Sequence, residues 1–169
     1  MIRHSPALHL IWQIADMEAE NLNQPMIRPA HFFLALLKSV DLDLEKSLKR
    51  VDTETSTEIK RDCLKLKNCV TEFILDPTQT RRFLRGILPK GEKKNSSEKR
   101  RRRTSLSKEV FKKAENDTQD RKGVVTPLHL LLALLECDEP QIRTILDKVD
   151  VDLDDFKKYL VAQIKNRTI

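Results

Sequence analysis

A nine-residue apolar stretch occurs twice in this chain of 169 residues. Pro29-Ala-His-Phe-Phe-Leu-Ala-Leu-Leu37 returns 98 residues later as Pro127-Leu-His-Leu-Leu-Leu-Ala-Leu-Leu135, with six of the nine positions identical and apolar residues exchanged at the other three. Ala, Leu and Phe without β-branched residues favour helix over strand. Proline suits a first helical turn, where its missing N–H would have no partner. The two copies therefore predict two buried central helices, one in each of two tandem units.

The residues around the first copy predict a four-helix unit. An apolar stripe indicates a helix from about Ser5 to Leu22, with Ser5 as its N-cap, and the central helix follows it. A third helix is expected to carry Leu44 and Leu48 on one face. A fourth is expected to start at Thr55-Ser-Thr-Glu58, which has the form of a capping box.

The second half repeats this plan beyond the central motif. Phe111 matches Trp12 in the helix before the central one, and Asp150 matches Asp52 in the loop before the last helix. A correspondence of this length indicates duplication of a structural unit. We therefore expect an all-α fold, a pseudo-twofold tandem repeat of a four-helix unit, built as one compact domain. Its parts are expected to be the first repeat 1–77, a basic linker 78–104 and the second repeat 105–169.

The linker carries most of the positive charge. Eleven Lys or Arg and two Glu fall between Arg81 and Arg103, whereas the whole chain has a net charge of only +6. Like-charged polar residues bury too little surface to offset the entropy of ordering, so Lys90–Arg103 is expected to be mobile. Apolar residues within Phe83–Leu88 predict a short helical extension docked on the core.

Composition narrows the class of protein. Three glycines and 5% aromatic residues agree with an all-α protein. Cys63, Cys69 and Cys137 form no C-x-x-C pair and are odd in number, which favours a reducing compartment. No signal peptide is visible at the N-terminus, and the longest apolar run is far shorter than the roughly 20 residues of a membrane span. We therefore expect a cytoplasmic protein without a membrane anchor.

No motif for catalysis, cofactor binding or metal binding is found. The chain lacks a nucleophile elbow, an H-E-x-x-H pair and a G-x-x-x-x-G-K-[ST] phosphate loop. Each central helix has one histidine, His31 or His129, without a partner at metal-ligand spacing. We interpret both as first-turn histidines that hydrogen-bond locally. Cys63 lies on an apolar stripe, where core packing explains it.

Taken together, the two central motifs and their flanking helices resemble the amino-terminal domain of the Clp ATPases, which are protein unfoldases. The most specific elements are Ile27-Arg-Pro-Ala-His-Phe-Phe-Leu-Ala-Leu-Leu37 and Val125-Thr-Pro-Leu-His-Leu-Leu-Leu-Ala-Leu-Leu135. Thr104-Ser-Leu-Ser-Lys-Glu-Val-Phe-Lys-Lys-Ala114 is similar to the family's entry into its second repeat. The resemblance covers nearly the whole chain apart from the linker.

The resemblance implies a non-catalytic docking domain. Its partners would be adaptor proteins, unfolded substrate segments or Clp ATPase and protease subunits, and the isolated domain would be monomeric. Recognition is expected in grooves between the two repeats. The chain is then either the front part of an ATP-dependent unfoldase or a standalone regulator of a Clp protease.

By family position, the partner-binding residues would be Ser5, Arg28, Ala30, Lys122 and Leu128. Some family members carry acidic residues at the positions of Ala30, Leu128 and Lys122, and bind cationic or phosphoarginine-bearing substrates with them. This chain lacks those carboxylates, so that mode of recognition does not transfer to it.

The arginine run Arg100, Arg101, Arg102, Arg103 offers a different function. These residues could bind nucleic acid by neutralising phosphates. No aromatic residue is interleaved with them for base stacking, which favours a solvated loop or an acidic protein surface as the alternative.

Overall fold

The computed structural model describes residues 2–92, 100–118 and 123–166. These residues form helices joined by four two-residue strands, and the all-α fold is confirmed. The helices are α1 (Pro6–Asn21), α2 (Pro29–Asp41), α3 (Leu44–Ser47), α4 (Thr53–Phe73), α5 (Pro77–Ile87), α6 (Ser105–Asn116), α7 (Pro127–Glu136), α8 (Pro140–Lys148) and α9 (Leu153–Lys165). The strands are β1 (Arg3–His4), β2 (Met26–Ile27), β3 (Arg102–Arg103) and β4 (Val124–Val125).

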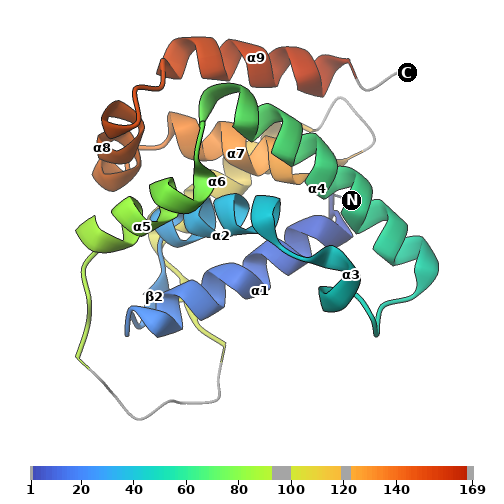
Figure 1. The fold of residues 1–169 in the computed structure, drawn as a ribbon, viewed down its shortest axis with the longest axis horizontal. Coiled ribbons are helices and arrows are strands. Elements are labelled where there is room, and N and C mark those ends of the chain that lie inside the picture. Colours follow the sequence, from blue (N-terminus) through green and yellow to red (C-terminus); the bar gives the residue numbers. More distant parts are fainter. Residues whose placement is uncertain (1, 93–99, 119–122, 167–169) are drawn as a thin grey trace.

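The two apolar stretches form the central helices α2 and α7, as predicted. Every residue of α2 except Lys38 and Asp41 is buried, and so is every residue of α7 except Glu136. Figure 1 shows α2 in the middle of the molecule, with α1 on one side and α7 on the other. One continuous apolar cluster contains residues of both helices, so the two repeats share a single core.

Two short strand pairs link the repeats. β1 pairs with β4, and β2 pairs with β3, both in parallel. The pairing continues at the helix N-caps, where the Ser5 N–H donates to the Val125 carbonyl at 2.9 Å and the Thr104 N–H donates to the Ile27 carbonyl at 3.0 Å. In each pair, the strand before the first helix of one repeat meets the strand before the central helix of the other. This reciprocal exchange relates the repeats by a pseudo-twofold axis.

The start of α4 differs from the predicted capping box at Thr55. Asp52 is the N-cap, and its carboxylate accepts the Thr55 N–H at 2.9 Å, so the helix begins at Thr53. A carboxylate is an effective cap because it also interacts favourably with the positive end of the helix dipole. The equivalent cap of α9 is Asp152, whereas Asp150 lies in the preceding turn with a φ of 59°. The match of Asp150 to Asp52 is therefore wrong.

The third helices of the two repeats differ in length and burial. α3 has four residues and buries none of them, whereas α8 has nine and buries Ile142, Ile145 and Leu146. The first repeat compensates with the 21-residue helix α4, which contacts α1, α2, α7 and α9. The two units therefore share a plan without being equal in size.

The predicted helical extension is confirmed as α5, which packs on α2 and α8. Leu84 of α5 and Leu88, which caps its C-terminal end, are buried. The remainder of the predicted linker is described only in part, because residues 93–99 lie outside the described residues. The division of the chain at residues 77 and 104 stays a prediction.

A buried carboxylate fixes α5 to the first repeat. Glu18 of α1 is 1% exposed, and Arg85 of α5 donates to its two oxygens at 3.1 and 2.6 Å. Lys38 of α2 lies 3.9 Å from the same carboxylate. Three helices therefore meet at one ion-pair cluster, in which the planar guanidinium binds the carboxylate with two parallel hydrogen bonds.

We expect Arg85→Met to lower the free energy of unfolding by about 2 kcal/mol, because the buried Glu18 loses its bidentate partner. The partial exposure of Arg85 keeps this loss below that of a fully buried pair. Urea denaturation measures the change. Arg82→Met, on the exposed side of the same helix, is the matched control and should change stability by less than about 0.5 kcal/mol. Equal losses in the two variants would contradict the anchoring role of Arg85.

Candidate docking groove between the repeats

A groove runs between α4 and the strand pair that joins the repeats. It has a volume of about 710 Å³. Its walls come from the start of the first repeat, from α4 and from the entry into α7, so both repeats contribute. We call this the inter-repeat groove, and its lining residues are Arg3, His4, Ser5, Pro6, Glu58, Arg61, Asp62, Lys65, Val124 and Thr126.

The floor of the inter-repeat groove is built from two helix N-caps. Ser5 caps α1, and its hydroxyl accepts the Leu8 N–H at 3.2 Å. Thr126 caps α7, and its hydroxyl lies 2.8 Å from His129 Nδ1. Both caps are almost completely buried, at 4% and 3% exposure. The local hydrogen bonds predicted for the two central histidines are confirmed: His129 Nδ1 accepts the Thr126 N–H at 3.1 Å, and His31 Nδ1 accepts the Arg28 N–H at 2.9 Å.

The rim of the inter-repeat groove carries charges of both signs. Arg61 and Lys65 are exposed and one helical turn apart on α4, and Arg3 is exposed on β1. Among the residues that the structure describes, neither Arg61 nor Lys65 takes part in an ion pair. Glu58 lies one turn before Arg61 and adds a half-buried carboxylate. A rim of this kind suits a polar, charged peptide segment better than an apolar ligand.

The structure places the sequence-predicted partner residues mostly in the interior. Ala30 is 0% exposed and Leu128 is 5% exposed, because both lie in the first turn of a buried central helix. Arg28 is the N-cap of α2 and donates to Glu139 at 2.8 Å. Lys122 lies outside the described residues. Of the four that the structure describes, only Ser5 is among the residues that line the inter-repeat groove, and the partner-binding role of the set stays a prediction.

Two residues of the arginine run are packed against the first helices of the repeats, α1 and α6. Arg101 donates to Asp16 at 3.4 Å and to the Gln24 carbonyl at 3.0 Å. The Arg103 guanidinium lies 4.5 Å from the Trp12 ring centroid and 5.0 Å from that of Phe111. These two arginines, predicted to be mobile, are therefore held by specific contacts.

Arg100 and Arg102 are exposed. Alternate residues of the run thus point to the protein and to solvent, as in a strand. The arginine run therefore exposes half of the positive charge that the sequence suggests. Contact of this run with a polyanion stays a prediction.

The cysteines have little nucleophilic character at neutral pH. Burial raises the pKa of Cys63 to about 11, with the nearby Asp62 carboxylate adding to the effect. Burial likewise raises the pKa of Cys69 to about 11, reinforced by Glu72. The reactive thiolate form is therefore scarce in both.

Among the described residues, no group of three or more His, Cys, Asp or Glu side chains is placed to hold a metal ion. No helix in the described ranges is long and apolar enough to cross a membrane.

Comparison with solved structures identifies the fold. The chain matches the N-terminal domain of the caseinolytic protease associated chaperone ClpD from Arabidopsis thaliana with a TM-score of 0.58, at 12% identity over 97% of this chain and 96% of that one. It matches the Hsp104 N-terminal domain from Candida albicans with a TM-score of 0.57, at 19% identity over 94% and 89% of the two chains.

A third match, described as part of a malarial protein secretion system, has a TM-score of 0.56 at 17% identity over 96% and 95% of the chains. No protein-family model matches the sequence, and no curated protein matches it significantly. The chain has a double-repeat helical fold, and this is the fold of the Clp and Hsp104 N-terminal domains. The resemblance noted from the two central motifs is confirmed at the level of the fold.

The groove-lining residues of α4 were not found by sequence reasoning. Arg61 and Lys65 belong to a charged helix face, which is ordinarily solvated. Their partners across the groove, around Arg3 and Val124, are distant in the sequence and are brought close only by the pairing of β1 with β4. No pattern along the chain indicates that contact.

Proposed function

We propose that the chain is a non-catalytic protein-docking domain of a Clp-type unfoldase or protease system. It would bind adaptor proteins or unfolded substrate segments in the inter-repeat groove. The observation that carries the proposal is the structural likeness to Clp and Hsp104 N-terminal domains, which extends over almost the full length of the compared chains. The position of the inter-repeat groove, where both repeats contribute walls, adds to it.

The inter-repeat groove suits this role because its rigid and adjustable parts are separate. The floor is fixed by the paired strands and by the capped starts of α1 and α7. The rim consists of long side chains on α4, such as Arg61 and Lys65, which can adapt to different partners. Exposed charges of this kind contribute chiefly to specificity and to the rate of association.

A double charge reversal in the inter-repeat groove tests the proposal. We expect Arg61→Glu/Lys65→Glu to weaken binding of a reduced, carboxymethylated unfolded protein by roughly tenfold or more, since two cations that face an anionic client are replaced by repelling carboxylates. Fluorescence anisotropy of the labelled client measures the affinity. The reversed residues are exposed, so the fold should persist, and circular dichroism checks this.

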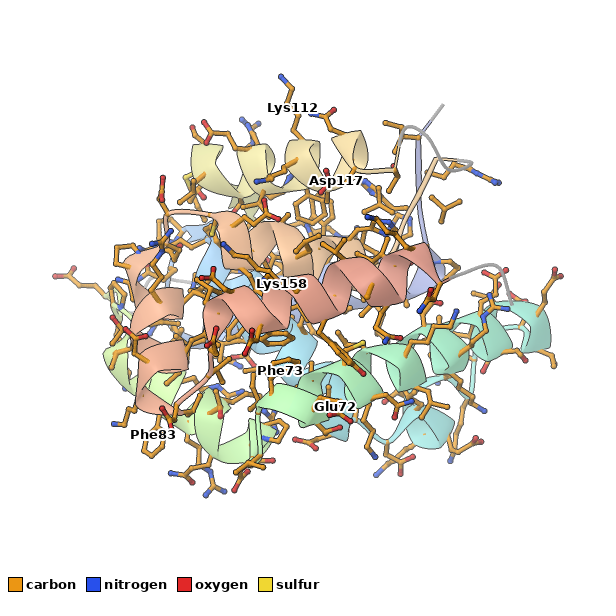
Figure 2. All side chains as sticks on the ribbon, turned by 90° about the horizontal axis from the view of Figure 1, so that it is seen from above. Glu72, Phe73, Phe83, Lys112, Asp117 and Lys158 are labelled. Atoms are coloured by element: carbon orange, nitrogen blue, oxygen red, sulfur yellow. The ribbon has the colours of Figure 1, made fainter. Side chains whose placement is uncertain are left out.

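The matched control is Lys112→Glu/Lys158→Glu, which makes the same charge change away from the inter-repeat groove. Figure 2 shows Lys112 on α6 and Lys158 on α9, and both side chains are exposed. This variant should bind the client nearly as well as the wild type. If the two double variants lose the same affinity, binding depends on net charge only. If the wild type does not bind the client, nor any Clp subunit or adaptor in the same assay, the docking function itself is refuted.

A further inference from the structure

A second groove lies on the far side of α4. Two adjoining hollows of about 590 and 380 Å³ share Asp43, Glu45 and Lys60 and follow one face of α4 past α3. Ser56, Lys60, Leu64 and Lys67 form the α4 wall of these hollows, at a spacing that places them on one helical stripe. We call the two hollows together the α3–α4 groove. Figure 1 shows α3 at the outer edge of the molecule, near α4.

The α3–α4 groove exists because the first repeat lacks a full third helix. By the 98-residue offset in the sequence, Leu44 of α3 corresponds to Ile142 of α8. Ile142 is 1% exposed, whereas Leu44 is only partly buried. Leu64, on the facing wall, is 58% exposed. The short α3 therefore leaves the Leu64 side chain open on the wall of the groove, on the side of α4 that faces the partly buried Leu44.

The charged residues of the α3–α4 groove indicate the charge of its partner. Four lysines and two carboxylates line the α3–α4 groove. Glu45 is paired with Lys60 at 2.6 Å, and the Asp43 carboxylate accepts the Lys46 N–H as the cap of α3. Within the described ranges, the ammonium groups of Lys46 and Lys67 take part in no ion pair. The groove thus presents uncompensated positive charge beside apolar side chains, which complements an acidic, partly apolar partner.

The walls of the α3–α4 groove favour a helical partner. Both are formed by helices and the turn between α2 and α3, so the lining offers no strand edge to an extended peptide. A helix satisfies its own backbone hydrogen bonds and needs only side-chain contacts from such a groove. The α4 stripe from Ser56 to Lys67 is about 16 Å long, which matches three helical turns. None of the described residues that line the groove is aromatic, so base stacking has no platform among them.

We propose that the α3–α4 groove binds an acidic amphipathic helix of a partner protein, about three turns long. The apolar face of that helix packs against Leu64 and Leu44, and its carboxylates face Lys46 and Lys67. This is a second docking surface, and it rests on the proposed function only in that the chain is a protein-binding module. The two surfaces lie on different faces of α4 and are tested with different probes.

The probe for the α3–α4 groove is a labelled synthetic peptide of about 14 residues that is amphipathic when helical, with leucines at i, i+3, i+4, i+7 and i+11 and Glu elsewhere. We expect the folded wild-type chain to bind it, and Lys67→Glu and Leu64→Ser each to weaken binding by roughly tenfold. Fluorescence anisotropy gives the affinities. Leu75→Ser is the matched control, since Leu75 is 98% exposed outside the groove, and it should leave binding unchanged.

Two altered peptides and two further measurements complete the test. A peptide with Lys in place of every Glu, and one with Ser in place of every Leu, should both fail to bind. Absence of wild-type binding, or binding that Lys67→Glu and Leu64→Ser leave intact, would overturn the proposal. So would displacement of the peptide by a short single-stranded DNA, which would make the surface a polyanion site. Sedimentation that shows a wild-type dimer lost in Leu64→Ser would instead assign the groove to a second copy of the chain. None of these outcomes depends on the unfolded-client assay, so either proposal can fail alone.

Discussion

Phe32→Ala is expected to lower the free energy of unfolding by about 3–5 kcal/mol, because a large aromatic side chain in a closed core leaves a cavity that its surroundings fill only partly. Phe32 is 0% exposed at the seam between the repeats. Its ring centroid lies 5.9 Å from that of Trp12 in α1 and 4.9 Å from that of Phe111 in α6, both close to edge-on. The substitution therefore removes contacts to the first helices of both repeats.

Urea denaturation followed by circular dichroism measures this loss. Trp12 is the sole tryptophan of the chain, so its fluorescence reports separately on the seam. Phe83→Ala on α5 is the control, because that ring is only partly buried and lies over the Lys148 ammonium at 4.1 Å. It should cost about 1–2 kcal/mol. Equal losses at Phe32 and Phe83 would show that the seam is not the stability centre of the fold.

The sequence showed Trp12 and Phe111 as equivalent positions of the two repeats, and the structure adds that their ring centroids lie 4.9 Å apart. A buried central helix must be apolar on all sides, and this one is, in both copies. Two such segments with matching flanking helices leave few arrangements other than a shared core. The fold class, the two central helices and the helical extension at α5 could therefore be predicted from apolar periodicity and from the repeat.

Ser5 caps α1 as predicted, but the start of α4 could not be placed as well, because several residues compete as its cap. Asp52 is followed by Thr53, Thr55 and Ser56, each of which has a side-chain oxygen that can cap a helix. The sequence does not show which residue adopts the extended backbone that a cap needs. The carboxylate of Asp52 does so in the structure, and the constant 98-residue offset then fails at Asp150.

The ordered arginines illustrate a similar limit. A run of four identical charges predicts a solvated segment, because unpaired guanidinium groups are costly to bury. Arg101 and Arg103 nevertheless have partners, an aspartate and two aromatic rings, which come from α1 and α6. Their partners become neighbours only when β3 pairs with β2. A groove between the repeats was expected from the resemblance, but its lining residues escaped prediction, since they come from segments that are remote in the sequence.

His31 makes the stability of the protein depend on pH. Burial, reinforced by the positive charge of Arg28, lowers the pKa of His31 from 6.5 to about 4. Its Nδ1 accepts the Arg28 backbone N–H at 2.9 Å, which holds the N-terminal turn of α2. A protonated ring would carry a hydrogen on that nitrogen and could no longer accept this bond. The folded state therefore favours the neutral form of His31 over the protonated form.

The sign of the effect follows from proton binding in the two states. Between pH 6.5 and about 4, the unfolded chain holds a proton on His31 that the folded chain does not. The contribution of His31 to stability is complete above pH 6.5 and is lost as the pH falls towards 4. The loss reaches about 3 kcal/mol if His31 acts alone. Carboxylates that titrate in the same range add their own dependence, so the wild type must be compared with a variant.

His31→Gln is the informative variant, because glutamine at the same position in the first turn can accept the Arg28 N–H but does not titrate. At pH 7 the variant should be less stable than the wild type, since it loses the packing of a buried ring. Between pH 7 and 4 the wild type should lose about 3 kcal/mol more than the variant, so the two stability curves converge or cross. Urea unfolding at closely spaced pH values gives both curves. Curves that stay parallel would show that His31 keeps the same proton affinity in the folded and unfolded chain, and that its hydrogen bond to Arg28 does not depend on the neutral ring.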